Sequence, residues 1–200
     1  MTTVNSQAQL LAWGGNDNLT FGSYFTITGT WTPLNINNSV TINGNFHTIT
    51  IGITLFSGLF KIPINSSSTI TIQNINMVYN TGSSIADGGG SIVGDCAGSN
   101  NFYTLSITAC SATGAGTNNY IGSTGGGIVG RMLSHTTISK CVTKNLIGNL
   151  NSGGIIGQGS SSTCTIDTCC SNCIPGDYGG GYYGGDGNGN YHEMLFNRIN

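Results

Sequence analysis

The chain has 200 residues, of which only 6% are charged, and its net charge is −2. Its five Lys and Arg residues can neutralise few phosphates, which argues against nucleic-acid binding by counterion release. The longest apolar runs, such as residues 51–56, are too short to span a bilayer, so we expect no membrane insertion.

The first predicted element is a short capping helix within residues 1–15. Ser6 to Gln9 matches a capping box, and the Gly14-Gly15 pair ends the helix. A stack of short strands has open apolar ends that need a polar-backed cover, so we expect the helix to cover the N-terminal end. The first six residues lack the basic and apolar regions of a secretory signal, so no signal peptide is expected. The apolar side chains of the predicted helix are those of Ala8, Leu10, Leu11 and Trp13.

Four short segments between the helix and residue 51 alternate apolar and polar residues, with Gly, Pro or Asn between them. Period-two alternation predicts strands with one buried face, and threonine on the outward positions favours strands further. The predicted strands are 25–28, 34–37, 40–43 and 48–51.

The middle of the chain contains an internal repeat of two elements. A glycine element occurs at 89–94, 125–130 and 153–157, and an Ile/Cys element at 105–110, 136–141 and 164–169. Weaker copies stand at 57–60 and 70–75. Self-similarity at this period is typical of stacked repeats that share one core.

Each Ile/Cys element predicts a short strand followed by a turn, after which the next apolar residue points inward again. Glycine elements suit tight corners, because glycine accepts positive φ and close backbone approach. Parallel crossovers are nearly always right-handed, so we predict an all-β fold, a right-handed parallel β-helix that forms one domain over residues 1–175. An antiparallel sandwich would instead show hairpin signals and no such repeat. The inward turn residues are Ile75, Cys110, Cys141 and Cys169.

Residues 176–200 are predicted to form a separate Gly/Tyr-rich tail. Residues 176–190 are mostly Gly, Tyr, Asp and Asn without a strand pattern, and 191–196 are apolar again. We expect this apolar segment to dock on the last repeat of the chain or on a neighbouring subunit.

The glycine element followed by Ile-x-x-Cys resembles the GLUG repeat of β-helical surface proteins and adhesin-like chains. Residues 40–49, with their Asn-Gly-Asn-Phe-His-Thr-Ile turn, resemble the opening coil of such proteins. The resemblance covers about residues 25–173 and implies a parallel β-helix without a shared catalytic set. The spacings vary, the chain is shorter than most secreted adhesins, and we expect it to lack their signal and anchor.

In its content of Asn, Ile and Thr the chain also resembles β-helical virion proteins of large amoeba-infecting DNA viruses and trimeric β-helices of phage spikes. This second resemblance is one of overall style, and no single motif carries it. It implies a homotrimer on or in a particle.

A catalytic site is not apparent. Glycoside hydrolysis needs two carboxylates about 5–10 Å apart on a rigid face, and no Asp-Asp pair or calcium-type cluster occurs. Arg131 is interpreted as a surface residue and His47 as a turn residue, while His135 and His192 lack triad partners. We predict no enzymatic activity, no catalytic residues and no cofactor or metal. The candidate carboxylates of the enzyme hypothesis are Asp87, Asp95, Asp167, Asp177 and Asp186.

The seven cysteines allow three interpretations. Cys110, Cys141 and Cys169 share one repeat position, which favours a buried ladder of reduced thiols. Stacked neighbours could also oxidise to one or two disulfides. Cys170-Ser-Asn-Cys173 has the spacing of zinc ligands but lacks a second pair at a distance.

The leading functional hypothesis is a non-enzymatic structural or surface-recognition module that forms homo-oligomers, with a trimer favoured, in a virion. An alternative is a glycan- or receptor-binding module of a cell surface or the extracellular space. A carbohydrate-active enzyme is the third hypothesis. The aromatic residues that could bind sugars are Tyr120, Tyr178, Tyr182 and Tyr183.

Overall fold

The computed structural model describes residues 1–63, 68–96, 103–131, 135–158, 164–177, 179–182 and 184. These residues form eighteen strands and one helix, α1 (Gln7–Ala12). Every strand pair among them is parallel, within sheets that share one apolar core. The all-β class is therefore confirmed, and the antiparallel sandwich does not describe this chain.

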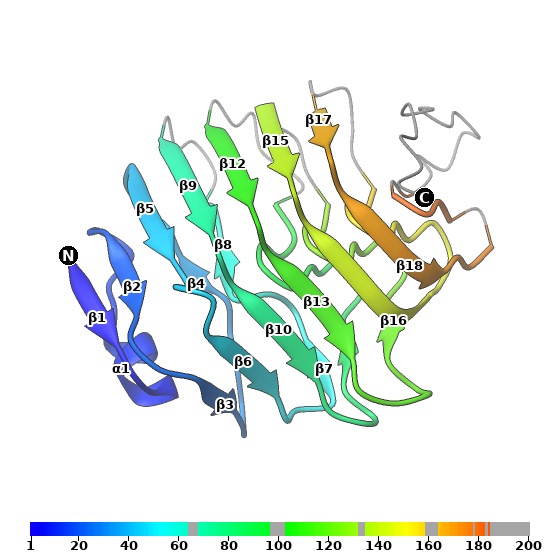
Figure 1. Cartoon of the computed structure of the whole chain (residues 1–200), viewed down its shortest axis with the longest axis horizontal. Coiled ribbons are helices and arrows are strands. Elements are labelled where there is room, and N and C mark those ends of the chain that lie inside the picture. The colour runs from blue at the N-terminus through cyan, green and yellow to red at the C-terminus, as the bar shows by residue number, and fades with distance from the viewer. Residues whose placement is uncertain are drawn as a thin grey trace.

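Two large sheets run along the molecule from the N-terminal to the C-terminal end (Figure 1). The seven-stranded sheet has the order β1 (Thr2–Val4), β2 (Leu19–Phe21), β5 (Val40–Asn43), β9 (Thr69–Gln73), β12 (Thr104–Thr108), β15 (His135–Ser139) and β17 (Cys164–Asp167). The nine-stranded sheet comprises β3 (Phe25–Ile27), β6 (Thr48–Ile51), β10 (Asn76–Tyr79), β13 (Ser111–Gly114), β16 (Val142–Gly148), β14 (Tyr120–Ile121), β11 (Ser84–Ile85) and β7 (Leu55–Phe56), with β18 (Cys170–Ile174) paired to β16. A third sheet pairs β4 (Leu34–Asn35) with β8 (Phe60–Lys61).

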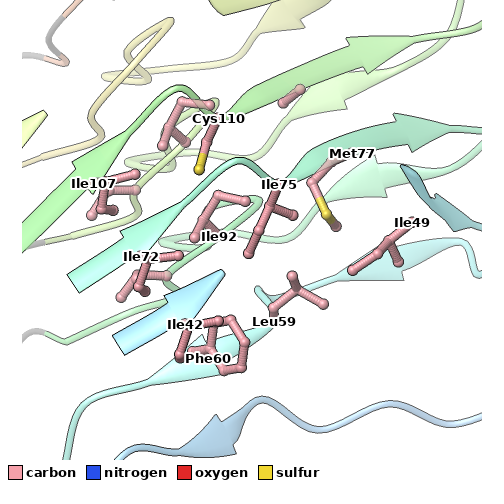
Figure 2. Close-up of a cluster of buried hydrophobic side chains, with 14 of the residues drawn as sticks. Ile42, Ile49, Leu59, Phe60, Ile72, Ile75, Met77, Ile92, Ile107 and Cys110 are labelled. Carbon is pink, nitrogen blue, oxygen red and sulfur yellow. The ribbon is translucent and has the colours of Figure 1, made fainter. Parts of the chain in front are cut away.

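The register of the seven-stranded sheet aligns the Ile/Cys elements as the repeat predicts. Ile72 pairs with Ile107, Ile107 with Ile138, and Ile138 with Ile166. Side chains alternate between the faces of a strand, so these isoleucines lie on one face of the sheet. Figure 2 shows Ile42, Ile72 and Ile107 following one another in the core, with Ile75 and Cys110 beside them.

A residue with left-handed backbone conformation follows each of β9, β12, β15 and β17 and turns the chain toward the nine-stranded sheet. Asn74, Ala109, Lys140 and Thr168 have φ between 52° and 58°. This conformation costs free energy in residues other than glycine and asparagine, so other interactions must stabilise it. The N–H of each of the first three donates to a carbonyl of the following repeat, at 3.0–3.1 Å. The next residue points inward, and Ile75, Cys110 and Cys141 are at most 1% exposed.

The glycine elements stack in the same way. Each closing glycine donates its N–H, at 2.9 Å, to the backbone carbonyl of the last apolar residue in the preceding copy. These hydrogen bonds are Gly94 to Phe60, Gly130 to Val93 and Gly157 to Val129. Gly184 donates to Ile156 in the same pattern at 3.0 Å, and Gly153 bridges Gly180. Residues 179–182 and 184 thus continue the pattern of the glycine element, although the sequence prediction placed them in a tail without a strand pattern.

The N-terminal end carries α1, as predicted, but the helix is shorter than residues 1–15. Ser6 caps it by accepting a hydrogen bond from the Gln9 N–H at 3.3 Å. Leu10 and Trp13 are buried, whereas Ala8 and Leu11 are exposed. Residues 2–4 form β1 because they pair with β2, which follows α1 in the chain. The sequence analysis did not predict β1, since a three-residue strand is too short to show an alternating pattern.

The last repeat, comprising β17, β18 and the glycine element at 179–182 and 184, is less buried than those before it. Ile138 is 0% exposed, whereas its partner Ile166 is partly exposed and Ile174 is 65% exposed. The predicted apolar segment at 191–196 lies outside the described residues, so its docking remains a prediction.

Candidate functional site

The outward face of the seven-stranded sheet carries one continuous row of hydroxyl side chains, which we call the hydroxyl face. Its members pair in strict register across five neighbouring strands, and three of them are exposed. Strands in a sheet are about 4.7–4.9 Å apart, so the hydroxyl groups recur at that interval. The row consists of Thr41, Thr71, Ser106, Thr137 and Thr165.

The hydroxyl face is almost free of charge. Among the strand residues of this sheet only Asp167 carries a formal charge, and it lies at the C-terminal edge. The neighbouring outward row is hydrogen-bonded along the stack, with the Thr108 and Ser139 hydroxyls 2.9 Å apart. The matching outward row of the nine-stranded sheet differs, because it contains Val78 and the charged Lys144. The sequence prediction used the outward threonines only as evidence for strands.

The carboxylates of the enzyme hypothesis are engaged at separate places. Asp95 forms an ion pair with Arg131, which occupies the matching position one repeat later. Asp87 accepts a hydrogen bond from the Ser123 N–H at 2.8 Å. Asp167 accepts one from the Thr168 hydroxyl on the outer side of β17. Arg131 is therefore an ion-pair partner as well as a surface residue, and Asp186 lies outside the described residues.

The two histidines among the described residues, His47 and His135, lie in different parts of the fold, the first in a turn and the second on a strand. The backbone N–H of His47 donates to Gly44 at 2.8 Å and closes the turn before β6, as the sequence predicts. His135 begins β15 and is exposed beside Thr104. His192 lies outside the described residues.

The predicted sugar-binding tyrosines occupy different environments. Tyr120 on β14 is 38% exposed. Tyr182 packs against the core, and its hydroxyl donates to the Cys169 carbonyl at 3.2 Å. The exposed aromatic side chains of Tyr24 and Phe46 were not singled out from the sequence, because isolated aromatic residues carry no pattern. Tyr178 and Tyr183 lie outside the described residues.

Three cysteines form a row at the turn between the large sheets, as the repeat predicts. Each sulfur lies near the carbonyl two residues earlier, at 3.5 Å for Cys110, 3.3 Å for Cys141 and 3.4 Å for Cys169. The Cys141 N–H also donates to the Cys169 sulfur at 3.4 Å. All seven cysteines are thiols in the structure.

Burial and neighbouring thiols suppress ionisation of Cys141, Cys169 and Cys164. The hydrogen bond with the Cys110 thiol, aided by burial, raises the pKa of Cys141 to about 12. The hydrogen bond with Cys141 and burial likewise raise the pKa of Cys169. Burial raises the pKa of Cys164 to about 12. The thiolate is the reactive form, so these groups react slowly at neutral pH.

The zinc interpretation of Cys170-Ser-Asn-Cys173 meets a geometric obstacle. Both cysteines lie on β18, whose exposure alternates, so the exposed Cys170 and the partly buried Cys173 point to opposite faces. Among the described residues no three His, Cys, Asp or Glu side chains are grouped to hold a metal ion.

A pocket of about 360 Å³ lies at the N-terminal end, between α1 and β1. Its polar groups are mutually engaged. The Thr2 hydroxyl donates to the Asp17 carboxylate at 2.7 Å, and the Trp13 indole N–H does so at 3.1 Å. The hydrogen bond from Thr2 holds the pKa of Asp17 below its usual value.

Comparison with known proteins does not assign a family. No family model matches the chain, and no curated protein is similar to it. A solved structure of a Bacteroides ovatus protein, described as an immunoglobulin A1 protease, aligns over 87% of this chain and 76% of its own. Its identity is 14% and its TM-score 0.38, a likeness too distant to carry an argument. No helix among the described residues could span a membrane.

Proposed function

We propose that the parallel sheets are the faces of a right-handed β-helix that serves as a non-enzymatic structural or surface-recognition module. Parallel strands joined within a sheet cross over right-handedly in about 98% of cases, which supports the hand. The repeated register supports the helix itself, because each strand pairs with its counterpart in the next repeat.

The hydroxyl face carries the functional proposal. Removing charged groups from water is expensive, whereas hydroxyl groups can exchange water for partners across an interface at little net cost. A regular, uncharged row therefore suits contact with another extended surface. We propose that this surface is another copy of the chain, in a homotrimer belonging to a virion or similar particle, as its resemblance to particle proteins implies.

Charge placed on the hydroxyl face tests the proposal. We expect the unaltered chain to be oligomeric by size-exclusion chromatography with light scattering, and Thr71→Arg/Thr137→Arg to shift it toward monomer. Each arginine would lose its hydration water in the interface or lie close to the same arginine of another copy, and both are unfavourable for a charged group. The matched control is Thr50→Arg/Thr113→Arg, two outward threonines also two strands apart, but on the nine-stranded sheet.

The control variant should remain oligomeric. A monomer of the unaltered chain at micromolar concentration, or equal effects of the two double variants, would contradict self-association through the hydroxyl face.

Glycan or receptor binding is the second candidate, favoured by the exposed ring of Tyr120 on β14. An exposed aromatic face can stack on the apolar side of a pyranose ring. A glycan array probed with the unaltered chain and with Tyr120→Ala tests it: binding that Tyr120→Ala abolishes supports this candidate. No binding by either protein, or equal binding by both, rules out a sugar platform at Tyr120.

A further inference from the structure

The cysteine row places three thiols at equivalent positions of successive repeats. The residues that follow them pair in register, Ser111 with Val142 and Val142 with Cys170. Neighbouring strands are about 4.7–4.9 Å apart, within the 4.4–6.8 Å Cα separation that disulfides adopt. The Cys169 sulfur lies 3.6 Å from the Ile138 carbonyl of the preceding repeat, so it leans toward Cys141.

We propose that Cys141 and Cys169 are a site of oxidative modification, where one disulfide joins the last repeat to the one before it. A sulfur forms only one S–S bond, and Cys141 stands between two neighbours. Pairing with Cys110 and pairing with Cys169 therefore exclude each other, and the third cysteine stays a thiol.

The difference in exposure favours a disulfide between Cys141 and Cys169 over one between Cys110 and Cys141. Cys110 and Cys141 are 1% and 0% exposed, whereas Cys169 belongs to the last repeat and is partly exposed. Of the three thiols in the row, Cys169 is the one that an oxidant arriving from water meets first. Cys141 is its neighbour in the row, since its N–H already donates to the Cys169 sulfur.

The oxidant is a low-molecular-weight disulfide, R–S–S–R. The Cys169 thiol loses its proton to water and attacks one sulfur of R–S–S–R, which breaks that bond and releases a thiolate that is then protonated to RSH. The Cys141 thiol then loses its proton to water, and its thiolate attacks the Cys169 sulfur of the mixed disulfide; this S–S bond breaks and releases a second thiolate, which is protonated to RSH. Two cysteine thiols are oxidised, and one R–S–S–R is reduced to two RSH. The raised pKa values of both thiols make the reaction slow at neutral pH and faster in alkali.

The disulfide would link the last repeat covalently to the repeat before it. Cys141 and Cys169 are 28 residues apart. Of the two strands in the last repeat, β17 is the end member of the seven-stranded sheet and β18 pairs with β16 alone. A cross-link of this kind restrains the unfolded chain and opposes fraying of the edge strands, so the oxidised protein should melt at a higher temperature.

Peptide mapping of the full chain tests the proposal. The protein carries Cys170→Ser, which removes the exposed neighbouring thiol, and is incubated with glutathione disulfide at pH 7 and pH 9. After an acid quench and alkylation, trypsin and an Asp-specific protease release Cys141 within 141–144 and Cys169 within 167–176. We expect these two peptides to be linked without reductant, to accumulate faster at pH 9, and to coincide with a higher Tm.

Two controls separate the row from other thiols. Cys110→Ser should leave the linked peptides unchanged, whereas Cys141→Ala should abolish them while circular dichroism confirms folding. If Cys141→Ala does not fold, Cys169→Ser, altered at the partly exposed position, replaces it with the same expected loss. A main product linking Cys110 to Cys141, a link from Cys169 to Cys164 or Cys173, or no link in the folded protein would overturn the proposal.

Discussion

Gly126→Ala is expected to destabilise the protein at the upper end of the roughly 1–3 kcal/mol typical of overpacked sites, or beyond it. A Cβ at Gly126 would overlap the Val129 carbonyl oxygen and the Gly157 amide nitrogen. Both are backbone atoms and cannot rotate away, so the stacked glycine elements would have to separate. The midpoint of urea unfolding, compared with that of the unaltered chain, measures the loss.

Gly181→Ala is the matched control, in the last copy of the same glycine element. A Cβ there meets no atom within 4 Å, and φ at Gly181 is not in the positive range that strains other residues. We expect a change within about 0.5 kcal/mol, as for surface substitutions. Equal losses in the two variants would show that the glycine elements are not required for close packing.

Ile107→Ala is expected to cost about 2–5 kcal/mol, the range for removing a large aliphatic side chain from a core. Ile107 is 0% exposed and lies between Ile72 and Ile138 in the stacked row. The cavity would open between two repeats that are held by their own backbone hydrogen bonds, so collapse around it is restricted. Urea unfolding monitored by circular dichroism gives the difference.

Ser106→Ala provides the control within the same strand. Ser106 precedes Ile107 and points to the hydroxyl face, so its loss should change stability by no more than about 0.5 kcal/mol. A stability loss at Ser106 as large as that at Ile107 would contradict the assignment of inward and outward faces.

The strand pairing and the turns could be predicted because the repeat expresses them locally. Side chains alternate strictly along a strand, so Ile-x-Ile fixes which face is buried. The residue three places after the last inward isoleucine is also apolar, as Cys141 is after Ile138. Strict alternation would point it outward, so the chain must turn between the two. Aligning the copies gives the parallel register directly, which is why the pairing of Ile107 with Ile138 follows from the repeat alone.

The features that the sequence did not predict depend on partners distant in the chain. Residues 179–182 and 184 pair as a glycine element although Tyr182 replaces the usual isoleucine, because the backbone N–H groups of Ile155 and Ile156 donate to the Tyr182 carbonyl. The ion pair of Asp95 with Arg131 likewise joins residues 36 apart. Neither contact follows from its neighbours in the sequence.

Composition and repeat by themselves determined that this protein is a stack of short strands with little charge, since alternation and glycine spacing act over a few residues. Tertiary structure alone decided how far each outward hydroxyl and each thiol is exposed, and it alone brought Asp95 together with Arg131. The reason is physical. A local pattern specifies which way a side chain points, whereas its exposure and its ion pairs depend on distant segments, such as those of Asp95 and Arg131, which are 36 residues apart.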